Sequence, residues 1–267
     1  MTHNKGDFLN LLKVHNCQIQ FDLPSSASVS GATQHFQETE GTTVVAVRYK
    51  EGVIIGGDRR ATAGTSVIYD RAEKLLQIDE YSVMAIAGSP AIAYEMGRVL
   101  EHSFQYFRRS QLQGLSLEGK LRMLSRLLRE NLPMALQGIG AVIPIFALYD
   151  LQSDGGKIFF YDALGAHFES TDFATSGSGS VWIRGVLYYQ NRWGDTQLVN
   201  MDEQEATITL LRLLDAASEY DVATSGYNPK SNIFPTVKTI TKDGIHDLST
   251  ERLQETYVQF IETNHAR

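Results

Sequence analysis

The pattern of apolar and polar residues changes character at Gly41. Residues 1–41 show no sustained period: a short apolar cluster at residues 8–14 is followed by a serine-rich tract at residues 25–31. A tract of this composition buries little apolar surface and is typical of a flexible segment. From residue 43 onward, apolar residues recur with the periods of strands and helices. We therefore predict one folded domain over residues 42–267, preceded by a leader over residues 1–41.

The first predicted elements of the domain are strands. Residues 43–57 contain two strand-like runs around a polar turn, and residues 74–87 contain two more. The polar residues 58–64, which connect the two pairs, indicate a loop. Four strands before any helix favour an antiparallel sheet over repeated βαβ units.

Helices and strands then alternate in blocks. Leucines at 117, 121, 124 and 128 follow a helical period, with Ser116 placed to cap the helix. Two antiparallel sheets between two helical layers would bury every apolar stripe, so the predicted fold is α+β, a four-layer αββα sandwich. The helices are predicted at 90–109, 116–136, 181–191, 202–219 and 249–263, the later strands at 142–149, 157–162, 167–169, 234–240 and 245–246, and a loop at 175–180.

Composition narrows the possible functions. The chain of 267 residues is 43% hydrophobic, with a net charge of −7, and this balance argues against nucleic acid or an anionic membrane as partner. No apolar run approaches the ~18–20 residues of a membrane span, and the first residues are too polar for a secretory signal. The single cysteine, Cys17, precedes the domain, and the seven histidines show no metal-ligand spacing. We expect a cytoplasmic protein without a metal or cofactor.

A threonine at the start of the domain suggests a specific chemistry. Cleavage after Gly41 would place the hydroxyl of Thr42 beside a free α-amino group, whose ordinary pKa of about 7.7–8.0 suits a general base near neutral pH. Taken alone, the residues Gly41 to Thr43 would more simply open an ordinary strand. The residues further along the chain decide between the two interpretations.

This chemistry needs a cation to keep the amine neutral, an anion to orient that cation, and a backbone N–H for the oxyanion. Asp58 follows the second predicted strand and Lys74 begins the third, so we expect them to pair at the first residue of the first strand. Without Thr42 in register, a surface ion pair would be the simpler interpretation of Asp58 and Lys74. Gly88, just before a helix, is the expected oxyanion donor because glycine allows close approach.

The order of these motifs resembles a known family. Thr42-Thr43 is followed by Asp58, by Lys74, by Ala87-Gly88, and later by Gly177-Ser178-Gly179-Ser180 and by Asp221 to Gly226. This arrangement is similar to that of proteasome β subunits, which are N-terminal nucleophile (Ntn) hydrolases, and it spans essentially all of residues 42–267. Phe234-Pro235-Thr236 and the leader are similar to the bacterial, actinobacterial type.

The resemblance implies a role for particular residues. Thr42 would be the nucleophile, its α-amino group the proton acceptor, and Lys74 and Asp58 the groups that tune the site. Thr62 and Gly88 would hold the substrate backbone as an added strand. Three further polar residues would support the catalytic amine: Ser178, Asp221 and Thr224. The S1 pocket would be lined by Ala61, Ala72, Leu76, Ile86, Pro90 and Tyr94, and Pro90 stands where the family usually has a small residue.

The resemblance also implies a function and partners. The chain would be a precursor that cuts itself between Gly41 and Thr42, removing a propeptide, and then degrades unfolded proteins as a threonine endopeptidase. It would work in stacked heptameric rings with α subunits and other β subunits, on which a ring ATPase docks. Helices 90–109 and 116–136, with Tyr94, Tyr106 and Phe107, are the expected contacts. The alternatives are an HslV-type peptidase, a metabolite amidase with the same nucleophile, and a non-catalytic structural ring subunit.

Overall fold

The computed structural model describes residues 41–63, 66–137, 140–228 and 231–262. The predicted leader lies outside these residues except for Gly41. Within the described residues, ten of the strands form two five-stranded sheets, and two short strands form a separate ribbon. All pairings are antiparallel, as the sequence pattern predicts.

The first sheet contains the strand that follows Thr42. Its order is β10-β1-β2-β11-β12, so that β1 lies between β2 and β10. Thr43 pairs with Gly177 on one side of β1, and Val44 pairs with Gly57 on the other. The strands are β1 (Thr43–Tyr49), β2 (Gly52–Gly57), β10 (Phe173–Gly177), β11 (Thr236–Thr241) and β12 (Gly244–Asp247).

The second sheet has the order β5-β6-β7-β8-β9. Its strands are β5 (Leu75–Asp79), β6 (Ser82–Ala85), β7 (Ile145–Asp150), β8 (Gly155–Tyr161) and β9 (His167–Ser170). The ribbon between the two hairpins consists of β3 (Ala61–Ala63) and β4 (Ser66–Tyr69).

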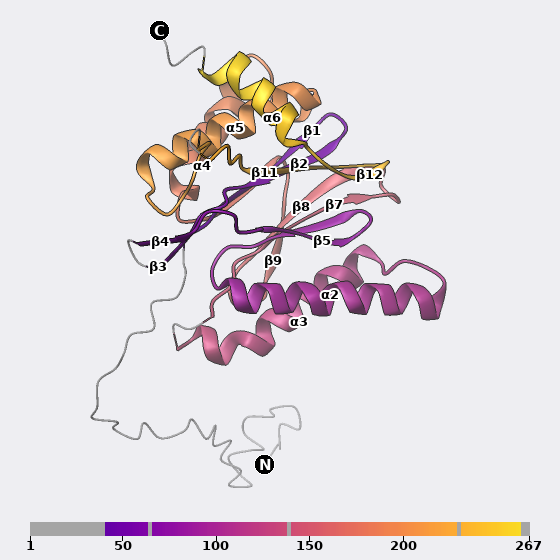
Figure 1. The fold of residues 1–267 in the computed structure, drawn as a ribbon. Coiled ribbons are helices and arrows are strands. Elements are labelled where there is room, and N and C mark those ends of the chain that lie inside the picture. Colours follow the sequence, from indigo (N-terminus) through magenta and orange to yellow (C-terminus); the bar gives the residue numbers. More distant parts are fainter. Residues whose placement is uncertain (1–40, 64–65, 138–139, 229–230, 263–267) are drawn as a thin grey trace, which may run out of the picture. The chain divides into compact units, whose positions relative to one another are not determined.

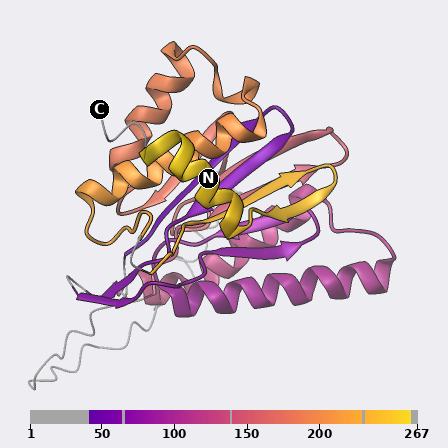
Figure 2. The ribbon, with the colours of Figure 1, turned by 45° about the horizontal axis from the view of Figure 1, so that its top comes forward.

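Helices cover the outer face of each sheet (Figures 1 and 2). Helices α2 (Pro90–Gln111) and α3 (Leu117–Ala135) pack on the second sheet, where Leu100 and Leu124 are fully buried. Ser116 caps α3 by accepting a hydrogen bond from the Gly119 N–H, as predicted. No helix in the described ranges is long and apolar enough to cross a membrane.

The first sheet is covered by the later helices. These are α4 (Ser180–Trp193), the 3₁₀ turn η1 (Leu198–Asn200), α5 (Glu203–Tyr220), α6 (Thr250–Tyr257) and the π-helical turn η2 (Val258–Glu262). A capping box between Asp202 and Glu205 begins α5, whose buried face includes Leu210 and Leu214. The last helix predicted from the sequence, residues 249–263, corresponds to α6 and η2 together, and residue 263 lies outside the described residues.

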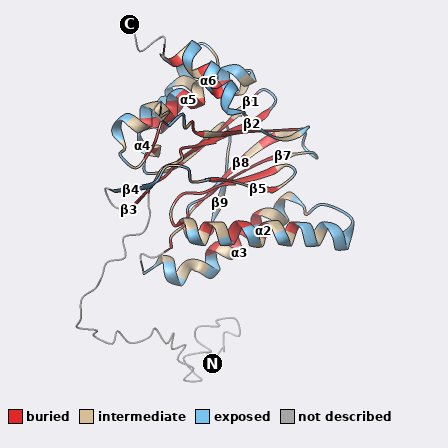
Figure 3. Cartoon of the chain, in the orientation of Figure 1, coloured by how far each residue is buried: buried red, intermediate tan, exposed pale blue. Residues whose placement is uncertain are grey.

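The core is a stack of three apolar layers. Between the sheets, β1 and β2 contribute Val44 and Ile55, while β6 and β8 contribute Val83 and Ile158. Each sheet also buries its other face against helices. Figure 3 shows buried residues concentrated in the strands and on the inner sides of the helices. The four-layer αββα sandwich predicted from the sequence is confirmed.

Three local predictions are wrong. Residues 61–63 form β3 rather than loop, and Phe173–Gly177 forms β10 where a loop was predicted to begin at residue 175. The two early hairpins belong to different sheets rather than to one. A three-residue strand is too short to show a period, and β10 is rich in small and polar residues, so backbone pairing defines both.

Candidate active site

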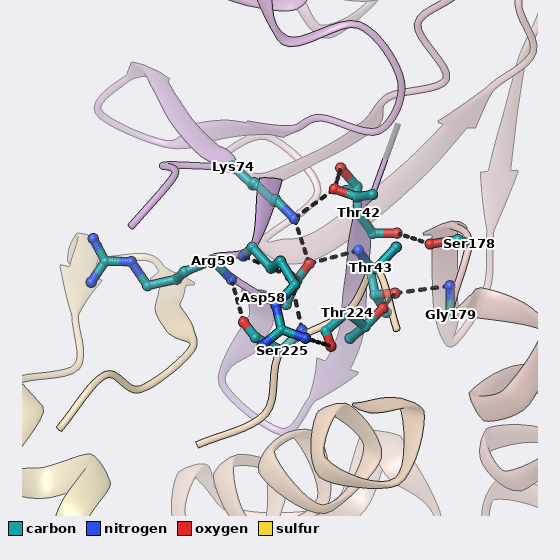
Figure 4. A network of polar contacts seen from close by, with 12 residues as sticks. Thr42, Thr43, Asp58, Arg59, Lys74, Ser178, Gly179, Thr224 and Ser225 are labelled. Carbon is teal, nitrogen blue, oxygen red and sulfur yellow. Dashed lines mark hydrogen bonds and ion pairs between the residues drawn. The ribbon is translucent and has the colours of Figure 1, made fainter. Parts of the chain in front are cut away.

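Thr42 lies at the entrance of β1, buried among polar groups from both sheets (Figure 4). Its side-chain hydroxyl donates a hydrogen bond of 2.7 Å to the carbonyl oxygen of Gly41, the residue that precedes it. Only 3% of Thr42 is exposed. The hydroxyl therefore lies next to the peptide bond at which we expect cleavage.

Asp58 and Lys74 meet beside this peptide bond. Asp58 follows β2 of the first sheet and Lys74 precedes β5 of the second, and the Lys74 Nζ lies 2.6 Å from the Asp58 Oδ1. The same Nζ donates to the Gly41 carbonyl oxygen at 3.1 Å. The predicted pair is thus present, but it joins two sheets instead of the ends of one, and its ammonium contacts the carbonyl of the bond to Thr42.

Backbone amides fix the Asp58 carboxylate. Its Oδ1 accepts from the Thr43 N–H at 2.7 Å, and its Oδ2 accepts from the N–H groups of Arg60 at 2.9 Å and Ser225 at 3.1 Å. Such charge-assisted bonds to rigid backbone hold the carboxylate in one orientation. Asp58 can therefore position the flexible Lys74 side chain.

Burial changes the proton affinity of Lys74. Its side chain is 5% exposed and that of Asp58 is fully buried. Loss of hydration lowers the pKa of Lys74 from its ordinary value, and this effect outweighs the opposing attraction of Asp58. An ammonium with a lowered pKa can both stabilise negative charge on the Gly41 oxygen and give up a proton more readily than a surface lysine.

A second carboxylate, Asp221, lies on the other side of Thr42. Its Oδ2 accepts hydrogen bonds from the hydroxyls of Ser178 at 2.6 Å and Thr224 at 2.5 Å. Ser178 also donates to the Thr42 carbonyl oxygen, from its N–H at 2.8 Å and from its hydroxyl at 3.2 Å. The structure therefore brings together all six residues that were predicted to be catalytic.

Glycine at position 177 permits the contact between Ser178 and the Thr42 carbonyl oxygen. Its φ of 92° lies in the left-handed region, and a Cβ there would lie 2.0 Å from the Thr42 carbonyl oxygen. Any side chain would push Ser178 away from Thr42. The sequence prediction did not include Gly177 as a shaping residue, although the Gly177-Ser178-Gly179 run was a visible signal.

Thr43 and Ser225 also belong to the network, and sequence reasoning did not assign either of them a role. The Thr43 hydroxyl is 2.5 Å from that of Thr224 and accepts the Gly179 N–H at 2.9 Å. The Ser225 hydroxyl accepts the Arg59 N–H at 3.2 Å. The doublet of threonines at 42 and 43 could have indicated the first of these.

Thr62 and Gly88, which were predicted to bind the substrate backbone, have different surroundings. Thr62 is buried, and a Cβ on Gly41 would lie 2.4 Å from its Oγ1, so Thr62 packs directly against the predicted cleavage site. Gly88 has a φ of 99°, and a Cβ there would lie 2.0 Å from the Ala141 carbonyl oxygen. The close approach predicted at Gly88 is thus made to the chain at Ala141, and the role of oxyanion donor stays a prediction.

The predicted S1 residues fall into two groups. Ile86 belongs to the apolar cluster between α2 and the second sheet, and Leu76 and Tyr94 pack against it. The Tyr94 hydroxyl also donates to the Glu73 carbonyl oxygen at 2.7 Å. The other three, which are half-buried and are not members of this cluster, are Ala61, Ala72 and Pro90.

The site consists of hydroxyl, carboxylate, ammonium and backbone groups. Across the described part of the chain, no group of three or more histidine, cysteine, aspartate or glutamate residues could hold a metal ion. Chemically, the arrangement offers a hydroxyl nucleophile, a cation with lowered proton affinity and two oriented carboxylates.

Comparison with known proteins gives consistent matches. A family model described as "Proteasome subunit" matches residues 38–228, a range that includes the Gly41–Thr42 bond. The proteasome subunit beta 2 of Thermomonospora curvata is 42% identical over 215 residues, which are 80% of this chain and 74% of that protein. The proteasome subunit beta of Acidothermus cellulolyticus is 37% identical over 243 residues, 90% of this chain and 81% of its own length.

A third similar protein aligns over a longer range. The proteasome subunit beta of Streptomyces griseus is 34% identical over 255 residues, covering 96% of this chain and 87% of that protein. This alignment is longer than the segment from Thr42 to Arg267, so it reaches into the residues before Thr42.

Proposed function

This chain belongs to the proteasome subunit family, and we propose that it is a catalytic β subunit that hydrolyses proteins with an N-terminal threonine. One observation carries the proposal: the buried Asp58–Lys74 pair, whose ammonium reaches the carbonyl oxygen of the residue before Thr42. Placing a lysine and an aspartate in the interior is costly unless they pair, and a purely structural ring subunit has no chemical need for such a pair beside Thr42.

We propose that residues 1–41 are a propeptide and that the chain cleaves itself. The Thr42 Oγ would attack the Gly41 carbonyl carbon, and the Lys74 ammonium would stabilise the negative charge that develops on the carbonyl oxygen. The proton of the Thr42 hydroxyl is passed, by way of a water molecule, to the Thr42 nitrogen: the oxygen–carbon bond forms as the hydroxyl loses it, and the peptide bond breaks as the nitrogen gains it. Water then hydrolyses the resulting ester, which leaves a carboxylate on Gly41 and a free amino group on Thr42.

In the mature subunit, the free amino group would accept the proton of the Thr42 hydroxyl as the Oγ attacks a substrate carbonyl. The departing amine of the substrate takes that proton, and water hydrolyses the acyl ester on Thr42. The charge of Lys74 would favour a neutral amino group, and Asp58 orients Lys74. Ser178, held by Asp221, would fix the Thr42 carbonyl.

We propose that substrates bind as an added strand next to Thr62 and Gly88, with the side chain before the cleaved bond in the S1 pocket. The position of Thr62 supports this proposal, because Thr62 packs against Gly41, the residue before the bond that we expect to be cleaved. The apolar surroundings of Ile86, Leu76 and Tyr94 favour apolar side chains in that pocket.

We propose that the subunit works in the cytoplasm within stacked rings that contain α subunits, with a ring ATPase on the α ring. Large exposed apolar residues support assembly, although they are distributed differently from the prediction. On α2, Tyr106 is exposed, but Tyr94 and Phe107 are half-buried. The aromatic residues exposed on α4 are Trp182, Tyr188, Tyr189 and Trp193, which makes α4 a further candidate contact.

Hydrolysis assays of particles co-expressed with an α chain test the proposed activity. Wild-type particles should hydrolyse casein and short peptides, whereas Thr42→Ala particles should lose on the order of 10⁴-fold or more because the nucleophile is gone. Activity on small amides without activity on casein would favour a metabolite amidase. Equal activity of wild-type and Thr42→Ala particles would contradict the proposed nucleophile.

A further inference from the structure

We propose that Thr43 is a positioning residue that joins two parts of the site: its hydroxyl binds the Asp221 cluster, and its backbone binds Asp58 of the Asp58–Lys74 pair. The inference rests on the proposed function, because it assigns Thr43 a role in the reaction of Thr42. Two bonds carry it: the Thr43 hydroxyl lies 2.5 Å from the Thr224 hydroxyl, and it accepts the Gly179 N–H at 2.9 Å. Thr43 is fully buried.

The direction of each bond follows from the donors available. An ionised carboxylate only accepts hydrogen bonds, so the Thr224 hydroxyl gives its one proton to Asp221. Thr224 must then accept from Thr43, and Thr43 accepts from the Gly179 N–H. The result is a directed chain from Gly179 through Thr43 and Thr224 to Asp221, in which each bond polarises the next.

The absence of a side chain at Gly179 leaves room for this series of hydrogen bonds. A Cβ at this position would lie 2.2 Å from the Thr43 Oγ1 and 2.8 Å from the Thr224 Oγ1. Both distances are too short for a carbon, so any side chain at position 179 would displace the two hydroxyls. Glycine at position 179 therefore lets both hydroxyls approach the backbone, and the Cβ of Ala217 on α5 would lie 3.2 Å from the same added atom.

The backbone of Thr43 binds the other carboxylate. Its N–H donates to the Asp58 Oδ1 at 2.7 Å, and its carbonyl oxygen accepts the Asp58 N–H at 3.1 Å. Figure 4 shows Thr43 between Asp58 on one side and Thr224 and Gly179 on the other. Thr43 therefore fixes the distance between two carboxylates. Asp58 orients Lys74, and Asp221 holds Ser178, which donates to the Thr42 carbonyl oxygen.

The hydroxyl, not the shape, is the feature that matters. Valine has nearly the shape of threonine but would leave the buried Gly179 N–H without its acceptor and remove the donor to Thr224. The strand would keep its pairing, since the backbone bonds of β1 do not involve the side chain. We expect the two halves of the site to shift relative to each other while the fold persists.

The test compares Thr43→Val, Thr43→Ser and wild type in particles co-expressed with the α chain. Thr207→Val is the matched control, because Thr207 is also buried but its hydroxyl bonds only within α5, to the Glu203 carbonyl oxygen. Two quantities are measured: the half-time of precursor cleavage, by mass spectrometry, and kcat and KM for a peptide. Should Thr43→Val not assemble, Thr43→Ala replaces it, because alanine also lacks a donor and an acceptor, and its rates are compared in the same way.

We expect Thr43→Val to slow cleavage and kcat by about 10- to 100-fold, the effect of a small misplacement of reacting groups, with KM nearly unchanged. Thr43→Ser should recover most of the rate, and Thr207→Val should behave as wild type. Rates of Thr43→Val equal to those of Thr207→Val would overturn the inference, as would equal losses in Thr43→Ser and Thr43→Val. An inactive wild-type particle would instead overturn the proposed function, and this role with it.

Discussion

Strand β5 has an ion pair at each end, and the two pairs have the same length. At its beginning, the Lys74 Nζ lies 2.6 Å from Asp58; at its end, the Lys120 Nζ lies 2.6 Å from Asp79. The exposed fractions of the side chains differ: 5% and 0% for Lys74 and Asp58, against 13% and 23% for Lys120 and Asp79. Separation alone therefore does not distinguish the two pairs.

The neighbours of the two pairs do distinguish them. Lys74 contacts the carbonyl oxygen of the bond before Thr42, and three backbone amides hold its partner. Lys120 instead reaches the Ser82 hydroxyl at 3.0 Å and lies 5.7 Å from the centre of the Phe104 ring. The pair at Lys120 ties α3 to the second sheet, whereas the pair at Lys74 contacts the carbonyl of the peptide bond at which we propose cleavage.

The largest expected difference is in activity. Lys74→Ala should lower peptide hydrolysis by at least ~100-fold, the contribution typical of a group that assists proton transfer. Lys74→Arg should not restore the rate, because a planar guanidinium cannot replace a compact ammonium in a closed site. Lys120→Ala is the matched control at the other end of the strand and should hydrolyse at nearly the wild-type rate. Equal losses in the Lys74→Ala and Lys120→Ala particles would show that both pairs act only through the fold.

The next difference is in stability. Asp58→Asn leaves a buried lysine without its counter-charge, so the free energy of unfolding should fall by roughly 3–5 kcal/mol. Asp79→Asn removes one member of a partly exposed pair and should lower it by only about 0–1 kcal/mol. Urea unfolding of the unassembled chains gives both values. A loss at Asp79→Asn as large as that at Asp58→Asn would remove the contrast in burial on which the comparison depends.

The smallest expected effect concerns pH. Burial puts the pKa of Lys74 in the folded chain below its unfolded value of about 10.4. Between these two values the unfolded chain binds a proton that the folded chain lacks, so the contribution of Lys74 to stability rises with pH, by at most about 1.4 kcal/mol per unit. Below the lowered pKa both states carry the proton and the contribution is constant.

Urea unfolding of wild type and Lys74→Met as a function of pH measures this contribution. The free energy of unfolding of wild type minus that of Lys74→Met should increase as the pH approaches 10. A difference that changes in favour of the mutant over that range would mean that the Lys74 pKa is raised rather than lowered.

Much of the fold could be predicted from the sequence because its signals are local. The leucines of α3 keep a helical period, and the apolar runs of β2 and β6 are long enough to be recognised as strands. The ribbon of β3 and β4 and the strand β10 lack such a signal. β3 and β4 pair with each other but are too short to show a period. The position of β10 depends on backbone pairing with β1, more than a hundred residues earlier, which no window of sequence contains.

The candidate site divides in the same way. That Thr42, Asp58 and Lys74 lie together could be predicted, because the proposed chemistry requires these residue types and the order of motifs resembles a known family. Their geometry could not, since it depends on how two sheets stack. The contacts of the Thr43 hydroxyl could not be predicted for a related reason: its partners, Thr224 and Gly179, lie more than a hundred residues away in the chain.

The central claim is that Thr42 becomes the first residue of the working protein. Mass spectrometry of the chain purified from assembled particles, in a host without another active subunit, tests it most directly. The wild-type chain should begin at Thr42, and the Thr42→Ala chain should retain residues 1–41. A wild-type chain that keeps those residues in a fully active particle, or a Thr42→Ala chain that is cut after Gly41, would contradict the account.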